Sequence, residues 1–132
     1  MTTINMLRAL AAALPLAAIS LPALADIKDY EFRLEQNEIK QGNGVVVAVK
    51  LIDKRSGRPV PDAVIFAQRI DMAPDGMEMM LSPIEAMPST EPGTYRFKTN
   101  LVMAGGWRLS LGAKIQGETG TLENRLIFKA VP

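Results

Sequence analysis

Methionine side chains are concentrated in one stretch of this 132-residue chain, residues 70–93. The stretch reads IDMAPDGMEMMLSPIEAMPSTEPG and contains neither lysine nor arginine. Thioether sulfur is a soft, neutral ligand that selects Cu(I) over Zn²⁺, Ca²⁺ or Mg²⁺. A thioether has no proton to lose, so a methionine site keeps working at acidic pH. The candidate metal ligands are Met77, Met79 and Met80, followed by Met72 and Met87.

The spacing of these methionines limits how they can share one ion. On an extended segment Met77 and Met79 lie on the same face, while Met80 points away. Met72 or Met87 would then complete the set from across the segment. Four prolines interrupt the stretch, and strand-like runs lie on both sides of it, so we expect a long connection on a β-scaffold.

Other roles for the same side chains stay open. Methionine is also a flexible core filler, and methionine-rich surfaces bind varied partners. Met103 is a further candidate ligand, and Trp107 a candidate aromatic neighbour of the cation, but a packing role is favoured for both. The acidic residues of the stretch lack the close spacing of a Ca²⁺ loop. Three of them are expected instead to help a cation approach: Asp71, Asp75 and Glu78.

Catalytic chemistry is disfavoured by composition. The chain contains no histidine and no cysteine, which supply most general acid–base and thiol chemistry. Ser82 and Ser89 have no evident base. We therefore expect a protein that is not an enzyme.

The first 25 residues have the pattern of a secretory signal. Arg8 precedes an apolar run that ends in Pro22-Ala23-Leu24-Ala25, and such a pattern predicts cleavage after Ala25. Residues 26–132 would then form the mature, periplasmic domain, with no membrane span. Its acidic and basic residues balance, which gives no electrostatic case for nucleic-acid binding. No disulfides are expected, because cysteine is absent.

Alternating apolar and polar residues predict β-strands over the rest of the chain. Residues 30–35 alternate as a half-buried strand does, and residues 45–52 (VVVAVKLI) are typical of a central strand. Two prolines just before residues 64–70 favour an edge strand or a bulge. Other strands are expected around Tyr95 and Phe97, around Trp107, Leu109 and Leu111, and around Leu122, Leu126, Phe128 and Val131. About six or seven strands joined by Gly/Pro turns predict an all-β sandwich.

Several short motifs, taken in order, resemble the YtkA-like/FixH-family domain. They are Asp53 to Val64 with its G-x-P-V core, the methionine-rich stretch, Pro92-Gly93-Thr94-Tyr95, and Met103-Ala104-Gly105-Gly106-Trp107-Arg108-Leu109. The resemblance covers most of residues 26–132. It implies an immunoglobulin-like β-sandwich of about seven strands outside the cytoplasmic membrane. It also implies a role in copper handling, heavy-metal efflux or assembly of copper-containing respiratory oxidases.

Two functions follow as hypotheses. In the first, a periplasmic accessory protein binds Cu(I), or a related soft metal, through the methionines. It passes the ion to an efflux pump or to an oxidase under assembly. In the second, a metal-free interaction module docks on an envelope complex through exposed methionines and a free sheet edge.

Overall fold

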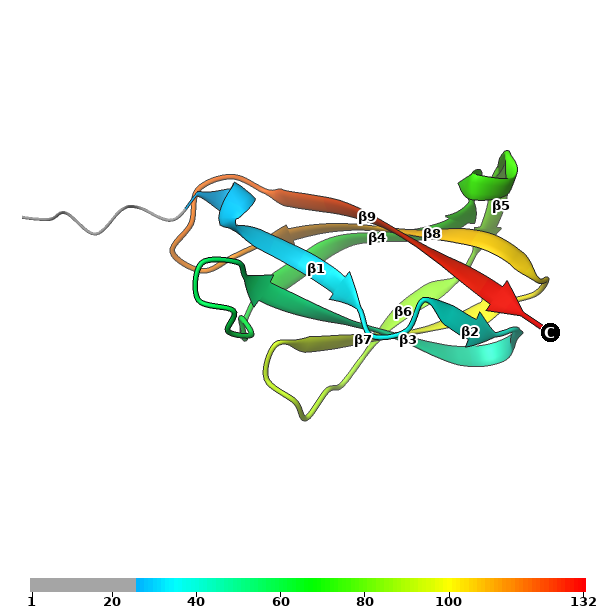
Figure 1. Ribbon diagram of the computed structural model, residues 1–132, viewed down its shortest axis with the longest axis horizontal. Coiled ribbons are helices and arrows are strands. Elements are labelled where there is room, and N and C mark those ends of the chain that lie inside the picture. The colour runs from blue at the N-terminus through cyan, green and yellow to red at the C-terminus, as the bar shows by residue number, and fades with distance from the viewer. Residues whose placement is uncertain (1–25) are drawn as a thin grey trace, which may run out of the picture.

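Two facing β-sheets make up the computed structural model, which describes residues 26–132 (Figure 1). The predicted all-β, immunoglobulin-like sandwich is confirmed. The predicted signal peptide, residues 1–25, lies outside the described residues. Within residues 26–132 no helix is long and apolar enough to cross a membrane. The helical elements of this part are two 3-10 turns, η1 (Ile27–Asp29) and η2 (Ala73–Asp75).

Each sheet draws its strands from distant parts of the chain. The four-stranded sheet has the order β1-β3-β7-β6, and the five-stranded sheet has the order β2-β9-β8-β4-β5. Described residues thus form nine strands, against the seven or so expected. The strands are β1 (Tyr30–Leu34), β2 (Glu38–Lys40), β3 (Gly42–Asp53), β4 (Val64–Met72), β5 (Met77–Ser82), β6 (Ile84–Met87), β7 (Thr94–Leu101), β8 (Gly105–Lys114) and β9 (Leu122–Val131).

Period-two alternation places the core as the sequence predicted. β3 lies inside its sheet between β1 and β7, and its Val47, Val49 and Leu51 are buried. β8 lies inside the other sheet and contributes Trp107, which is completely buried. Side chains on the inner faces of the two sheets therefore meet in one apolar layer. Its other large members include Phe32, Ile70, Phe97, Leu101, Leu109, Leu111 and Phe128.

The prolines before residue 64 predicted an edge or a bulge, and β4 has both features. β4 pairs with β8 along most of its length, with a register shift between Ile65 and Ala67. On its other side it pairs with β5 at residues 70–72 alone, so the first part of β4 is a sheet edge. A bulge at such a position bends the strand and increases its twist.

The methionine-rich stretch is not the long connection that the sequence predicted. β4 continues through Met72, η2 makes a tight turn, and β5 returns along β4. Pro83 then separates β5 from β6, which belongs to the opposite sheet. Pro83 has no N–H to donate to a ladder, so it marks where the chain leaves one sheet for the other. Irregular chain remains at residues 88–93.

Candidate functional site

The turn between β4 and β5 carries the methionines at one end of the sandwich. Pro74 lies in the first turn of η2, where its missing N–H is no loss. Gly76 ends η2 in the left-handed conformation, with φ of 73°, and its N–H donates to the Ala73 carbonyl at 2.8 Å. Glycine meets that backbone requirement without strain. The chain therefore reverses within four residues, and β5 begins at Met77.

A buried carboxylate fastens this turn to the sheet. Asp71 is completely buried, and its Oδ1 accepts a hydrogen bond from the Ala73 amide at 2.9 Å. Its Oδ2 accepts from Arg69 Nε at 3.0 Å and from Arg108 Nη2 at 3.1 Å. Arg69 Nη2 also donates to the Glu78 carbonyl of β5, at 3.0 Å. The Asp71 carboxyl group thus joins β4 to η2 and to β8, and Arg69 extends the link to β5.

The sequence suggested a different role for Asp71, that of drawing in a cation. Burial with three donors shows that this carboxylate is already neutralised by its own chain. Part of the structural role of Asp71 could be read from the sequence. Arg69 lies two residues before Asp71, and strand residues two apart lie on one face. The contribution of Arg108 was not visible, because it comes from a different strand.

A second carboxylate anchors the turn to β8. Asp75 Oδ2 accepts a hydrogen bond from the Gly106 amide at 3.0 Å. The turn lies so close to β8 that a Cβ added at Gly105 would come within 2.9 Å of Met72 Cε. A Cβ added at Gly106 would meet Pro74 Cβ at 2.7 Å. The turn therefore packs directly against Gly105 and Gly106.

This packing makes Gly106→Ala a sensitive test of the turn. The added methyl group must displace Pro74, and the variant is expected to lose about 1–3 kcal/mol of stability, as overpacked sites do. Chemical denaturation measures the loss. Gly112→Ala, on the same strand, is the matched control, because its methyl group would meet Ala67 Cβ and the exposed Phe66 ring at 3.2 Å, a looser contact than the 2.7 Å at Gly106. Equal losses in the two variants would contradict close packing of the turn on Gly106.

The structure separates the five candidate ligands. Met72 is completely buried in the core, so its predicted place in an accessible set of sulfurs is wrong. Met77 lies opposite Met72 in the ladder and packs against the core while half-buried. Met79 is 91% exposed and Met80 is 36% exposed. β5 therefore presents three methionines outside or at the margin of the core.

Met87 lies elsewhere in the fold. It ends β6, in the opposite sheet, and pairs with Arg96 of β7. It also lines a cleft beside the 88–93 segment. The structure does not bring Met87 to the methionines of β5, because β6 and β5 belong to different sheets. Its predicted role of completing the sulfur set from across the segment is therefore wrong.

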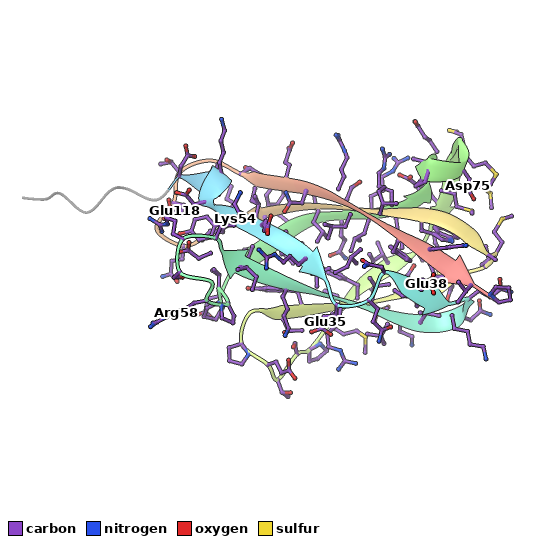
Figure 2. The ribbon with its side chains drawn as sticks, in the orientation of Figure 1. Glu35, Glu38, Lys54, Arg58, Asp75 and Glu118 are labelled. Atoms are coloured by element: carbon purple, nitrogen blue, oxygen red, sulfur yellow. The ribbon has the colours of Figure 1, made fainter. Side chains whose placement is uncertain are left out.

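A packing role was expected for both Met103 and Trp107, and the structure shows it for Trp107 but not for Met103. Trp107 is a core residue whose Nε1 donates to the Met103 carbonyl at 3.1 Å. Met103 is 39% exposed in the connection that leads into β8, next to the glycines that contact η2. Sulfur atoms accordingly gather near Asp75 in Figure 2, at this end of the sandwich. Leu81 and Val102 are also exposed.

Hard-ligand clusters are not found in the part of the chain that the structure describes. Among residues 26–132, no three His, Cys, Asp or Glu side chains come together as metal ligands would. β5 carries three methionines, and thioethers are ligands for soft monovalent ions.

The motifs that carry the family resemblance contact one another in space. A Cβ added at Gly93 would clash with Pro59 Cβ, so the motif containing Pro59 and the motif containing Gly93 touch. The Gly93 carbonyl accepts a hydrogen bond from the Leu51 amide at 2.9 Å. The Met103–Leu109 motif supplies the glycines under η2 and the buried Trp107. At these positions the motifs contribute to the packing of the fold.

Comparisons with known proteins show the family of this chain. No curated protein matches the chain. Among solved structures, the ZirS C-terminal domain is similar to it with a TM-score of 0.45 and 14% sequence identity, over 80% of this chain and 67% of that one. The model of the YtkA-like family matches residues 24–112, from just before η1 into β8. This chain therefore belongs to the YtkA-like family.

Proposed function

We propose that this protein is an exported accessory protein that carries Cu(I), or a related soft metal, as cargo on the thioethers of β5. The ligands are Met77, Met79 and Met80, and Met103 is a further thioether at the same end of the domain. The ion passes to a metal-efflux pump or to a respiratory oxidase under assembly. Export rests on the signal pattern of residues 1–25, and the two acceptors are those that the family resemblance implies.

The exposure of Met79 is the observation that carries the proposal. A methionine left in water forgoes about 1.5–3 kcal/mol of possible burial. Met79 is 91% exposed on β5, so it contributes nothing to the core. Core packing accounts for Met72 but not for Met79.

The placement of β5 also favours ion binding. Met77 and Met79 are two residues apart on β5, in the part where its pairing with β4 is irregular. Their flexible side chains have three rotatable bonds each, so both sulfurs can reach one ion. Asp71 and Asp75 hold the turn before β5, so little ordering is needed on binding. Neutral sulfurs hold the ion more weakly than thiolates, which suits a carrier that must release it.

Replacing Met77, Met79 and Met80 together by leucine tests the proposal. Leucine keeps volume and apolarity but removes sulfur. We expect Cu(I) retention, measured in competition with a Cu(I) chelator under reducing conditions, to weaken at least about tenfold, or about 1.4 kcal/mol. Retention is expected to be unchanged between pH 7 and pH 5, because thioethers do not titrate.

Met87→Leu is the matched control, since Met87 lies in the other sheet, and it should retain copper as the parent does. Circular dichroism confirms that the triple variant is folded. Unchanged copper retention by the folded triple variant would refute the proposal. If Met87→Leu lost as much copper retention as the triple variant, the ion would bind elsewhere.

A further inference from the structure

The first part of β4 is an unpaired sheet edge. Residues 64–69 pair with β8 on one side, but β5 reaches only residues 70–72 on the other. Among residues 26–132, no backbone–backbone hydrogen bond fills that side of residues 64–69. The cause is Pro83, where β5 ends and the chain crosses to the opposite sheet. Alternate N–H and C=O groups of β4 therefore point away from β8 with no strand to receive them.

A cleft of about 480 Å³ lies directly beside this edge. Its walls come from β4, from the end of β6, from the 88–93 segment and from β7. Ile65, Met87 and Phe97 give one part of it an apolar lining, and Asp62, Glu91 and Arg96 also line it. The Tyr95 hydroxyl, also at the cleft, donates to the Val60 carbonyl at 2.9 Å and accepts from the Ala63 amide at 3.0 Å. The polar group of Tyr95 is thus already occupied, which leaves its ring to face the cleft.

Side-chain alternation connects the edge to the cleft. Ala63 and Ile65 turn inward and pack against the core, whereas Val64 and Phe66 are 63% and 57% exposed. A strand added along this edge would alternate in the same way. Its residue opposite Ile65 would therefore point into the cleft, while the residues before and after it would face water.

Of the other free edges, β1, β6 and the free stretch of β9 carry features that discourage strand addition. β1 has Glu31 and Arg33, and the free stretch of β9 has Glu123 and Arg125. β6 has four residues between two prolines. Charges, prolines and short length are the usual protections of sheet edges. Residues 63–68 (AVIFAQ) carry no charge and no proline.

The bulge in β4 indicates what kind of strand fits. A bulge between Ile65 and Ala67 twists the edge, and twisted edges pair poorly with the flat edge of another sheet. A single short segment can follow the twist more easily than a second copy of this domain. The free backbone groups require that segment to be extended, and the apolar part of the cleft, at Ile65, Met87 and Phe97, favours one apolar side chain.

We propose that the free edge of β4 binds a short extended segment of a partner protein by strand addition, with an apolar side chain of that segment in the cleft. Main-chain hydrogen bonds supply affinity in this mode, and the cleft supplies specificity. Val64 lies roughly 25 Å along β4 from Met72, at about 3.3 Å per residue. The partner site is therefore separate from the methionines of β5, and it does not depend on copper.

A random linear heptapeptide library displayed on phage is the probe. It is selected against the parent protein and counter-selected against Ile65→Lys, which places a charge at the mouth of the cleft. Val64→Lys, one residue away but facing water, is the matched control. We expect enriched peptides to share one apolar position, to bind Val64→Lys normally and to lose binding to Ile65→Lys. Amide NMR shifts should appear at residues 63–68 and at Phe97.

Methylating two alternate amide nitrogens of an enriched peptide tests for main-chain pairing. Loss of two hydrogen bonds should weaken binding by about tenfold. The proposal would be overturned if no peptides were enriched for the parent protein over Ile65→Lys. It would also be overturned if N-methylation left the affinity of an enriched peptide unchanged. Concentration-dependent shifts at residues 63–68 without peptide would also overturn it, because a second copy would then occupy the edge.

Discussion

Replacing Trp107 by alanine is expected to destabilise the domain by about 3–5 kcal/mol, the cost of removing a buried aromatic side chain. Trp107 is completely buried on β8 and lies opposite Phe128 of β9 in the ladder. Its removal leaves a cavity that two packed sheets cannot close, because the strands on both sides are fixed by their hydrogen bonds. Urea or heat denaturation followed by circular dichroism measures the loss.

Trp107→Phe distinguishes packing from hydrogen bonding at this position. Phenylalanine keeps most of the apolar contact but cannot donate to the Met103 carbonyl, so a smaller loss of about 1–2 kcal/mol is expected. The Met103 carbonyl is in a connection at the surface, where water can replace the indole. A loss in Trp107→Phe as large as in Trp107→Ala would mean that the hydrogen bond, and not the core, accounts for the effect.

Asp71→Asn is expected to cost about 3 kcal/mol, toward the lower end for breaking a buried ion pair. The substitution leaves Arg69 and Arg108 without their carboxylate, and Arg108 Nε already has no partner within residues 26–132. Arg69 is half-exposed and can turn to water, which reduces the loss. The link between β4, η2 and β5 weakens as well, so faster hydrogen exchange is expected in β5 than in β8.

The same carboxylate makes stability depend on acidity. Burial by itself raises the pKa of Asp71, but hydrogen bonds from the Ala73 amide, Arg108 and Arg69 outweigh it and hold that pKa below its ordinary value of 3.8. The unfolded chain therefore binds a proton at a higher pH than the folded domain does. The stability that Asp71 contributes is present above about pH 4 and is lost as the pH falls through the lowered pKa.

Denaturation between pH 2 and pH 7 checks this prediction. The parent protein should lose stability steeply below pH 4, and Asp71→Asn should show a shallower loss over that range. Glu31→Gln, which removes an exposed pair with Arg33, should change stability little. An acid transition as steep in Asp71→Asn as in the parent would exclude Asp71 as its source.

Strands that alternate in hydrophobicity could be located from the sequence because their pattern is local. Residues 45–52 read as a central strand, and β3 occupies that place. The apolar positions of β8 are buried as expected. The short strand β2 was missed. Its three residues contain one buried side chain, Ile39, and their pairing with β9 is parallel and distant in sequence.

The methionine-rich stretch was misread because prolines and polar residues are common both in loops and in edge strands. β5 is mostly exposed, so it lacks the alternation that marks a half-buried strand. Its strand conformation depends on Asp71 and Arg69, which join it to β4, and on the turn that packs against Gly106. Those contacts cross between segments that no local pattern connects.

Residue types along the chain determined by themselves that this is an all-β domain rich in methionine at residues 70–93, with neither histidine nor cysteine. Composition and period-two alternation are properties of neighbouring residues, and they suffice for that. Only the tertiary structure decided that Met72 is core, that Met87 belongs to the opposite sheet, and that Met79 faces water. It also decided that β4 keeps an unpaired edge beside a cleft. Burial and strand pairing are set by residues far apart in the sequence, so the accessibility of a side chain or an edge appears only when the sheets pack together.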